Sequence, residues 1–331
     1  MIKNITIIGN GGMGSVCAML LCKNGVGATM WGHDAAELAA IASAKENVIF
    51  LPGYPLPESL GYEADDTAAL AGAELLVSAV PCQFMRGIWG RLKPHIPAGI
   101  PIVSITKGIE NNTLLRPTQI LAEILGPQHP LATLSGPNIA DEIAANLPAT
   151  ATVACRDADL ARQIQQAFNT PSFRVYTNDD CVGVELAGAM KNVIAIAAGI
   201  IDGIGAGDNA KAALITRGLA EIQRLGVALG AAEKTFTGLS GLGDLFTTCV
   251  SPKGRNRGFG ERIGKGMSVD EAIGATQSVV EGVPTCGGIV ELAKKHAVEM
   301  PITESVYSII QKQKTVKEAI ADLMTRELKA E

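Results

Sequence analysis

The sequence predicts an α/β fold with a doubly wound sheet, followed by a second domain that is entirely helical. Short β-rich segments alternate with helical segments up to about residue 176, a glycine-rich turn follows the first β-rich segment, and such segments stop after residue 180. The 331 residues are enough for two domains of ordinary size. We expect the first domain to span residues 1–178 and the second residues 179–331.

The β-rich segments predict the strands of the first domain. Several are apolar on both faces, as expected when helices cover both sides of a parallel sheet. The predicted strands are Ile5–Ile8, Ala28–Trp31, Leu75–Ser78, Ile102–Ile105, Leu131–Leu134, Thr150–Val153 and Phe173–Tyr176.

The second domain is predicted from helical periodicity and from helix-start signals. Ser268 and Thr315 each precede a Glu by three residues, which is the capping-box spacing, and Pro284 suits a first helical position. The predicted helices are Val182–Ile201, Asn209–Leu229, Gly254–Ile263, Val269–Ala275, Pro284–His296, Thr303–Gln313 and Val316–Lys329.

Composition limits the class of protein. Lys and Arg number 28 against 33 Asp and Glu, a net charge of −5 that argues against nucleic-acid binding by bulk charge. Apolar residues make up 47% and charged residues 18%, so disorder is excluded and some surface is expected to be buried between subunits. The seven cysteines are scattered without a C-x-x-C pair, which favours reduced cytosolic thiols over disulfides or a metal site.

Two further patterns concern the membrane and export. The first residues run directly into a predicted strand without the features of a signal peptide. The most apolar run, Val193–Ile201, is about half the ~20 residues that span a bilayer. We therefore expect a soluble cytoplasmic protein with no membrane span.

The first chemistry-bearing segment is Gly9-Asn10-Gly11-Gly12-Met13-Gly14, between a predicted strand and a predicted helix. This is the setting of the G-x-G-x-x-G dinucleotide fingerprint, in which Gly9 allows the turn, Gly11 admits the pyrophosphate and Gly14 allows close packing. At the end of the second strand, Asp34 lies where an acid holds the ribose of NAD, while His33 is suited to the 2′-phosphate of NADP. Asp34 is equally suited to cap the next helix, so the choice between NAD and NADP stays open.

Three other strands are followed by polar or punctuated loops that should converge at the carboxyl edge of the sheet: Val80-Pro81-Cys82-Gln83, Thr106-Lys107-Gly108 and Ser135-Gly136-Pro137-Asn138. Lys107 would place a cation there, or be a solvated charge, and Ser135-Gly136-Pro137-Asn138 would contribute to the site or be only a turn.

Lys191 lies on a predicted helix that is apolar nearly all round, which indicates burial. Small neighbours leave room for a ligand beside it, and partial desolvation would lower its pKa toward the range of a general acid-base; the alternative is a lysine that reaches the surface. Glu185 and Asn192 are seven residues apart and therefore lie on one face of this helix, where we expect them to form a structural pair.

Later loops supply charges of both signs. Asp244 follows three spaced glycines, and Arg255 with Asn256 is suited to grip a phosphate, although a salt-bridged surface turn is the simpler alternative. Glu281, in Val279-Val280-Glu281-Gly282, either belongs to the site or is only an acidic residue at the start of a helix.

Taken in order, these segments make the sequence resemble the bacterial-type NAD(P)-dependent glycerol-3-phosphate dehydrogenases along nearly its whole length. Besides the glycine turn, the text that carries the resemblance is Trp31-Gly32-His33-Asp34, Lys107-Gly108, Ser135-Gly136-Pro137, Lys191-Asn192-Val193, Ile215-Thr216-Arg217-Gly218, Gly241-Leu242-Gly243-Asp244-Leu245, Arg255-Asn256-Arg257 and Val279-Val280-Glu281-Gly282.

The resemblance implies a Rossmann domain, a helical domain like that of 6-phosphogluconate dehydrogenases, and reversible reduction of dihydroxyacetone phosphate to sn-glycerol 3-phosphate for phospholipid synthesis, by a homodimer. It implies that Lys191 is the proton donor and acceptor. The substrate contacts it implies are Lys107, Gly136, Asn138, Asp244, Gly254, Arg255 and Asn256, and the cofactor contacts are Gly12, Met13, His33, Lys107, Ala140, Arg255, Val279 and Glu281.

Three positions depart from the pattern of that family. Gly12 stands where Ser is frequent, and Asn138 and Gly254 stand where a hydroxyl residue is usual. Two other functions are compatible with the same motifs. One is a related dehydrogenase with a carboxylate substrate, of the ketopantoate or β-hydroxyacid type, and the other is a nucleotide-binding sensor without turnover, which the costly charges at Lys191, Asp244 and Arg255 disfavour.

Overall fold

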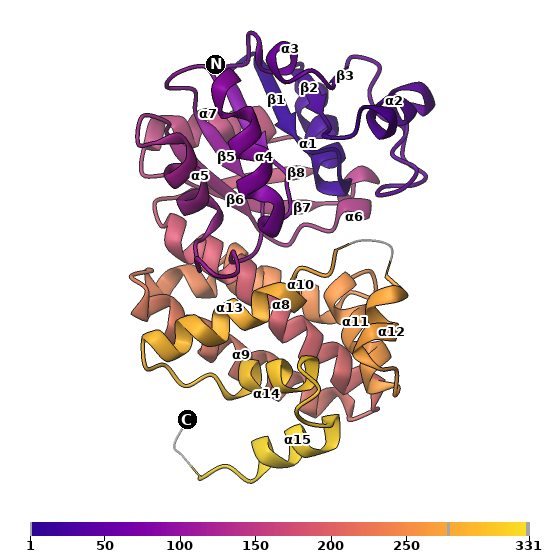
Figure 1. The fold of residues 1–331 in the computed structure, drawn as a ribbon, viewed down its shortest axis with the longest axis vertical. Helices are drawn as coiled ribbons and strands as arrows, with labels where there is room; N and C mark the ends of the chain where they lie inside the picture. The colour runs from indigo at the N-terminus through magenta and orange to yellow at the C-terminus, as the bar shows by residue number, and fades with distance from the viewer. Residues whose placement is uncertain (1, 277–278, 329–331) are drawn as a thin grey trace. The chain divides into compact units, whose positions relative to one another are not determined.

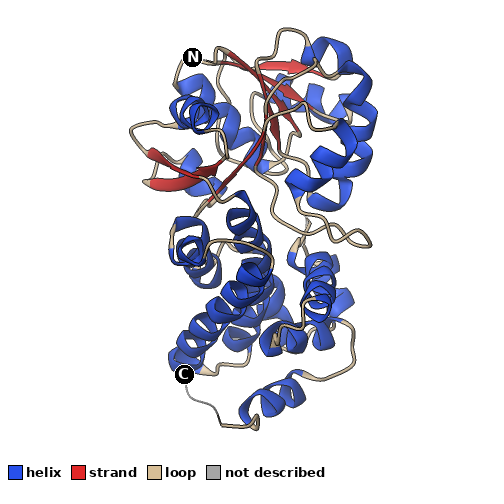
Figure 2. Cartoon of the chain, turned by 90° about the vertical axis from the view of Figure 1, so that its left-hand side faces the viewer, coloured by secondary structure: helices blue, strands red, loops and turns tan. Residues whose placement is uncertain are grey.

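The computed structural model describes residues 2–276 and 279–328. The chain divides into two compact units, the first formed by residues 1–107 and 115–185 and the second by residues 108–114 and 186–331. Figure 2 shows strands in the first unit and helices without strands in the described part of the second, as the sequence predicts.

The first unit is built on one eight-stranded sheet with the order β3-β2-β1-β4-β5-β6-β7-β8 (Figure 1). All neighbouring strands run parallel except β6 and β7, which are antiparallel. The strands are β1 Asn4–Ile8, β2 Gly27–Trp31, β3 Gly61–Glu63, β4 Leu75–Ser78, β5 Ile102–Ser104, β6 Leu131–Ser135, β7 Ala149–Ala154 and β8 Phe173–Asn178.

Helices cover both faces of this sheet. Alternate strand residues such as Ile7 and Ile8 belong to separate apolar clusters, one packed under α1, α2, α6 and α7 and the other under α3, α4 and α5. This is the doubly wound arrangement. The helices are α1 Gly12–Lys23, α2 Ala35–Ala44, α3 Asp66–Leu70, α4 Met85–Leu92, α5 Pro117–Leu125, α6 Ala140–Ala144 and α7 Ala158–Phe168.

The second unit surrounds the long helix α8, whose residues Ile194, Ala195 and Ile196 are fully buried. By length and composition α8 could cross a bilayer, but 94% of its most apolar window is buried, as in the core helix of a soluble protein. The helices are α8 Cys181–Gly203, α9 Gly207–Ala228, α10 Asp244–Val250, α11 Arg255–Gly264, α12 Val269–Gly274, α13 Gly282–Lys295, α14 Pro301–Ile310 and α15 Val316–Met324.

The starts of the helices can be compared with the capping boxes and the proline that predicted them. Ser268 and Thr315 each form the predicted capping box, accepting from the N–H of the Glu three residues later. The prediction for Pro284 was wrong, because α13 begins two residues earlier at Gly282, whereas prolines do begin α5, at Pro117, and α14, at Pro301. The strand β3 and the helix α10 were not predicted, since both are short and neither has a clear period.

Candidate active site

The glycine turn lies between β1 and α1 and fits a bound dinucleotide. A Cβ at Gly9, whose φ is +115°, would lie 2.8 Å from the carbonyl oxygen of Ala79, whereas a Cβ at Gly11 would meet nothing within 4 Å. No side chain caps the first turn of α1, and that turn carries no acid. The helix therefore presents uncapped N–H groups and its positive end beside open space, which is how a pyrophosphate is bound.

Gly12, one of the departures from the family pattern, has a local cause. A Cβ at this position would lie 2.7 Å from the carbonyl oxygen of Phe50, in the turn that follows α2. That turn is held in place because the amide of Asn47 donates to the carbonyl of Asn10 at 2.8 Å and to Ser15 Oγ at 2.9 Å. Gly12 is thus required by packing, and only its backbone is able to contact a cofactor.

The loop after β2 places His33 and Asp34 at the carboxyl edge of the sheet. His33 is exposed. Asp34 caps α2, its Oδ1 accepting from the N–H groups of Ala36 at 2.8 Å and Glu37 at 3.1 Å. These two backbone hydrogen bonds lower the pKa of the Asp34 carboxyl and keep it ionised, and the bond from Glu37 has the larger effect. The capping alternative for Asp34 is therefore confirmed.

Two other strand ends meet at the same edge. Lys107, which follows β5, donates from Nζ to the carbonyl of Gly136 after β6 at 3.2 Å. Asn138 donates from its amide to the carbonyl of Thr150 in β7 at 3.0 Å, and Ala140 begins α6. The predicted convergence of these loops is confirmed, and the amide of Asn138 braces its own loop.

In the second unit, Lys191 is buried and paired. Its Nζ donates to Asp244 Oδ1 and to Thr248 Oγ1, both at 2.6 Å. Lys191 is 7% exposed and Asp244 1% exposed. An ammonium at this depth requires an opposite charge, because water no longer solvates it. Lys191 and Asp244, which are 53 positions apart in sequence, form an ion pair; the alternative of a lysine reaching the surface is wrong.

Thr248 was missed in the sequence. It lies four residues after Asp244, on the same face of α10, and its hydroxyl also donates to the carbonyl of Asp244 at 2.7 Å. The only signal was the spacing Asp244-x-x-x-Thr248, which becomes visible once α10 is recognised as a helix. The neighbouring Cys249 is fully buried, and burial raises its pKa to about 12, so the thiol is not activated.

The residues predicted to hold a phosphate lie at the start of α11. Gly254 is the N-cap and offers no side chain to the first turn, so the N–H groups of that turn have no side-chain cap. Arg255 is the first helical residue, exposed, and its Nη1 donates to the carbonyl of Val279 at 3.3 Å. Glu281 is the N-cap residue of α13. The structure thus brings Arg255 and Val279 together at a helix start suited to an anion.

Asn256 is bound on both ends of its amide. Its Nδ2 donates to Asn192 Oδ1 at 2.9 Å, and its Oδ1 accepts from the N–H of Gly282 at 2.9 Å. Asn192 therefore pairs with Asn256 and not with Glu185. Glu185 accepts from the N–H of Thr118 at 2.7 Å and pairs with Arg116. The expected pair of Glu185 and Asn192 was wrong.

Glycines set the distance between α8 and α11. A Cβ at Gly260 would overlap the carbonyl oxygen of Ile196, and a Cβ at Gly199 would overlap that of Arg257. One turn further along, Gly203 and Gly264 face one another, and a Cβ at Gly203 would lie 2.7 Å from the Cα of Gly264. The backbones of α8, which bears Lys191, and α11, which begins with Arg255, are therefore in direct contact.

Comparison with known proteins gives the family. Residues 4–161 match the family described as NAD-dependent glycerol-3-phosphate dehydrogenase N-terminus, and residues 180–321 match the corresponding C-terminus. The chain belongs to the NAD-dependent glycerol-3-phosphate dehydrogenase family. It is similar to the proteins named glycerol-3-phosphate dehydrogenase [NAD(P)+] from Geobacter sp. (strain M21), 46% identical over 100% of this chain and 99% of that one, and from Thermobifida fusca, 47% identical over 99% and 98%.

Solved structures agree with this family. The glycerol-3-phosphate dehydrogenase from Coxiella burnetii superposes with a TM-score of 0.94 at 38% identity, over 98% of this chain and 99% of that chain. A ketopantoate reductase from Ralstonia eutropha reaches a TM-score of 0.62 at 15% identity, over 94% and 98%, and this likeness shows the fold alone. The comparisons therefore favour glycerol-3-phosphate dehydrogenase over the carboxylate alternative.

Proposed function

We propose that the chain reduces dihydroxyacetone phosphate to sn-glycerol 3-phosphate, reversibly and with NAD(P)H, using Lys191 as the proton donor and acceptor. The observation that carries this proposal is the buried ion pair of Lys191 and Asp244 within a helical unit that also bears Arg255. A charge pair costs free energy at this depth, so its presence needs a reason in the chemistry.

When bound, the reduced nicotinamide supplies a hydride to the carbonyl carbon of the substrate. Negative charge then develops on the carbonyl oxygen, and Lys191 Nζ stabilises this charge and transfers its proton there. Asp244 and Thr248 orient the ammonium by accepting its hydrogen bonds at 2.6 Å. In the reverse direction Lys191 takes the proton from the C2 hydroxyl.

The phosphate of the substrate would be held at the start of α11. Arg255 supplies a guanidinium, and the uncapped N–H groups after Gly254 supply further donors. An amide nitrogen carries two hydrogens and Asn192 accepts one from Asn256, so Asn256 is suited to donate the other to a phosphate oxygen. Binding the phosphate remotely from the reacting carbon fixes the geometry of reaction.

The cofactor would be held by the glycine turn, with backbone N–H groups of Gly11, Gly12, Met13 and Gly14 toward the pyrophosphate. His33, Lys107 and Ala140 are the other proposed contacts in the first unit, and Arg255, Val279 and Glu281 those in the second. Lys107, Gly136 and Asn138 would also contact the substrate. The open space at Gly11 and the tight packing at Gly9 support this role.

The decisive test is the oxidation of NADH or NADPH, followed by absorbance, with dihydroxyacetone phosphate and separately with unphosphorylated dihydroxyacetone. Turnover with the phosphate ester alone is expected. Lys191→Ala should lose turnover by about a thousandfold while still binding nucleotide, because the proton donor is gone. Lys234→Ala, which removes an exposed lysine of the same unit, is the matched control and should leave turnover unchanged. Equal turnover of Lys191→Ala and Lys234→Ala would exclude the proposal.

We further propose a cytoplasmic homodimer. The support for the compartment is that all seven cysteines are free thiols, as expected where the environment is reducing. The support for association is the low content of charged residues, 18%. Light scattering of the purified protein tests the dimer, and a monomer at micromolar concentration would contradict it.

A further inference from the structure

The edge of the sheet beside the glycine turn carries a carboxylate that the motifs did not single out. Glu37, in the first turn of α2, accepts a hydrogen bond from the amide of Asn10, the residue between Gly9 and Gly11. Asn10 is buried, and its Cγ lies 3.2 Å from where a Cβ would stand on Gly32. The glycine turn, the loop after β2 and Glu37 are therefore packed against one another.

This edge is where the adenosine ribose of a dinucleotide is recognised, by an acid about 20 residues beyond the glycines. Asp34 lies at that distance, but its Oδ1 is occupied by the cap of α2. Glu37 lies one turn further along the same helix and is aimed at the glycine turn by Asn10. Each of the two carboxylates has one oxygen engaged by these bonds, and Glu37 therefore adds a second carboxylate to this edge, held against the glycine turn.

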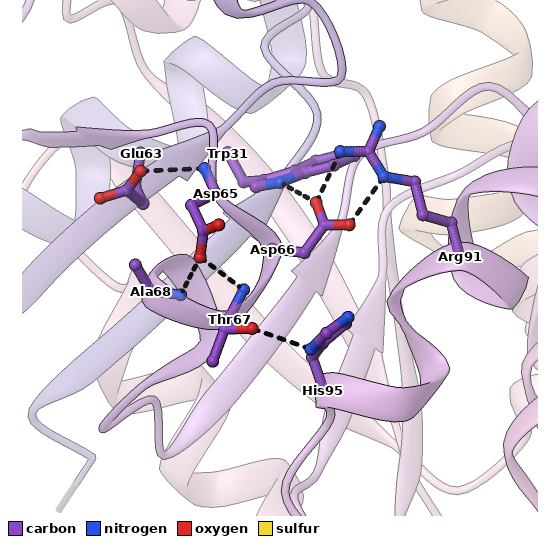
Figure 3. Close-up of polar contacts among 8 residues, drawn as sticks. All are labelled: Trp31, Glu63, Asp65, Asp66, Thr67, Ala68, Arg91 and His95. Carbon is purple, nitrogen blue, oxygen red and sulfur yellow. Dashed lines mark hydrogen bonds and ion pairs between the residues drawn. The ribbon is translucent and has the colours of Figure 1, made fainter.

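Carboxylates also lie on the neighbouring elements (Figure 3). Glu63 at the end of β3 accepts from the N–H of Asp65, and Asp65 caps α3. The guanidinium of Arg91 lies 5.3 Å from the ring centre of Trp31, the last residue of β2. Both arms of Arg91 are directed at Asp66, from Nε at 2.7 Å and Nη2 at 2.8 Å, and Trp31 donates to the same carboxylate at 3.1 Å.

Arg91 is therefore neutralised by a bidentate partner, and Asp66 holds it on the ring of Trp31 (Figure 3). Of the charged or titratable side chains in residues 31–37 and 63–66, all are carboxylates except His33. A 2′-phosphate adds a dianion with acceptors only, whereas a free 2′-hydroxyl is able to donate to a carboxylate.

We propose that the cofactor site prefers NAD(H) to NADP(H), and that Glu37, oriented by Asn10, is the residue that sets this preference. The inference rests on the proposed cofactor role of the glycine turn, and it names the cofactor that the family leaves open as NAD or NADP.

Binding of NADH and NADPH to the protein without substrate, measured by isothermal titration calorimetry, tests this directly. The wild type is expected to bind NADH at least tenfold more tightly. In Glu37→Gln the NADPH affinity should rise about tenfold, because a negative charge near the 2′-phosphate is removed, while the NADH affinity falls by a smaller factor. Asn10→Ala should move the ratio in the same direction, because Glu37 loses the donor that aims it.

Glu74→Gln is the matched control. Glu74 lies just before β4, at the amino edge of the sheet, where it accepts from the N–H of Lys3. Glu74→Gln removes the same charge from the same unit as Glu37→Gln, and it should leave the ratio of NADH affinity to NADPH affinity unchanged. Raising the salt concentration should narrow the gap between the two nucleotides in the wild type, since repulsion is screened.

The proposal is overturned if the wild type binds NADPH as tightly as NADH, if neither nucleotide binds, or if Glu37→Gln and Glu74→Gln shift the ratio equally. Because no substrate is present, failure of the enzyme to reduce dihydroxyacetone phosphate would contradict the proposed function without affecting this result. Steady-state kcat/KM for the two nucleotides then shows whether the preference persists during turnover.

Discussion

The contact between α8 and α11 makes a sharp prediction for Gly260→Ala. A Cβ at this position would overlap the carbonyl oxygen of Ile196 and lie 2.8 Å from its carbonyl carbon. Ordinary contact begins near 3.4 Å, so the helices must separate by at least 0.6 Å. Overpacking of this kind costs about 3 kcal/mol when backbone must move, whereas replacing a helical Gly by Ala returns about 1 kcal/mol.

The control for this prediction is Gly258→Ala, in the same helix. A Cβ there meets nothing within 4 Å, so this variant gains the same helix propensity without a clash. Because the propensity gain is common to both variants, the difference between them isolates the overpacking, about 3 kcal/mol. Thermal unfolding measures it, at roughly 2–4 °C per kcal/mol for a unit of this size. Equal melting temperatures for the two variants would refute the reasoning.

The same separation has a consequence for catalysis. Arg255 begins α11 and Lys191 lies on α8, so a displaced α11 moves the proposed phosphate ligand away from the proposed proton donor. We expect kcat/KM for dihydroxyacetone phosphate to fall by about ten- to a hundredfold in Gly260→Ala. Gly258→Ala should keep the wild-type value. A stable Gly260→Ala variant with unchanged kcat/KM would show that the spacing does not matter for the reaction.

Three other outcomes follow from single contacts. Gly12→Ser should lose about 1–3 kcal/mol of stability, measured by urea unfolding, because its Cβ would press on the carbonyl of Phe50; unchanged stability would contradict this. Burial raises the pKa of Glu221 above its ordinary 4.5, so Glu221 ionises in the unfolded chain at a lower pH than in the folded protein. The stability of the wild type should therefore fall as pH rises from about 4.5 through the folded-state pKa. Glu221→Gln should show a flatter dependence of stability on pH, and identical profiles for the two proteins would exclude the effect. Cys249, fully buried with a pKa raised to about 12, should resist iodoacetamide in the native protein and react after unfolding, which mass spectrometry detects; rapid native labelling would contradict its burial.

The sequence predicts what depends on local patterns. The glycine turn, the alternation of strands and helices, and the capping boxes at Ser268 and Thr315 each involve residues within a few positions of one another. The antiparallel direction of β7 could not be predicted from local patterns, because it is decided by pairing with β6, in which Thr133 lies opposite Ala154 of β7. Nothing in the residues of β7 themselves reports that choice.

The partners of buried polar groups show the same limit. Asp244 could be recognised as a candidate from its glycine-rich surroundings, but its pairing with Lys191 spans 53 positions and depends on α10 packing against α8. Glu221 was not singled out at all, although it accepts from the N–H groups of Ile302 at 2.6 Å and Thr303 at 3.1 Å and so caps α14 from another helix. A cap supplied through tertiary packing has no fixed spacing, so no local motif predicts it.

Asn256 shows that a candidate site residue can have structural partners that the sequence does not reveal. Its position after Arg255 marks it as a candidate phosphate ligand, but the structure gives its amide two internal partners, Asn192 beside Lys191 and the N–H of Gly282 at the start of α13. These bonds connect three helices beside Lys191, the proposed proton donor, and Arg255, the proposed phosphate ligand. Replacement of Asn256 by Asp would remove the donor to Asn192, and replacement by Ala would also leave the N–H of Gly282 without its acceptor. Substitutions of Asn256 are therefore limited by its structural hydrogen bonds to Asn192 and Gly282, whether or not it also contacts substrate.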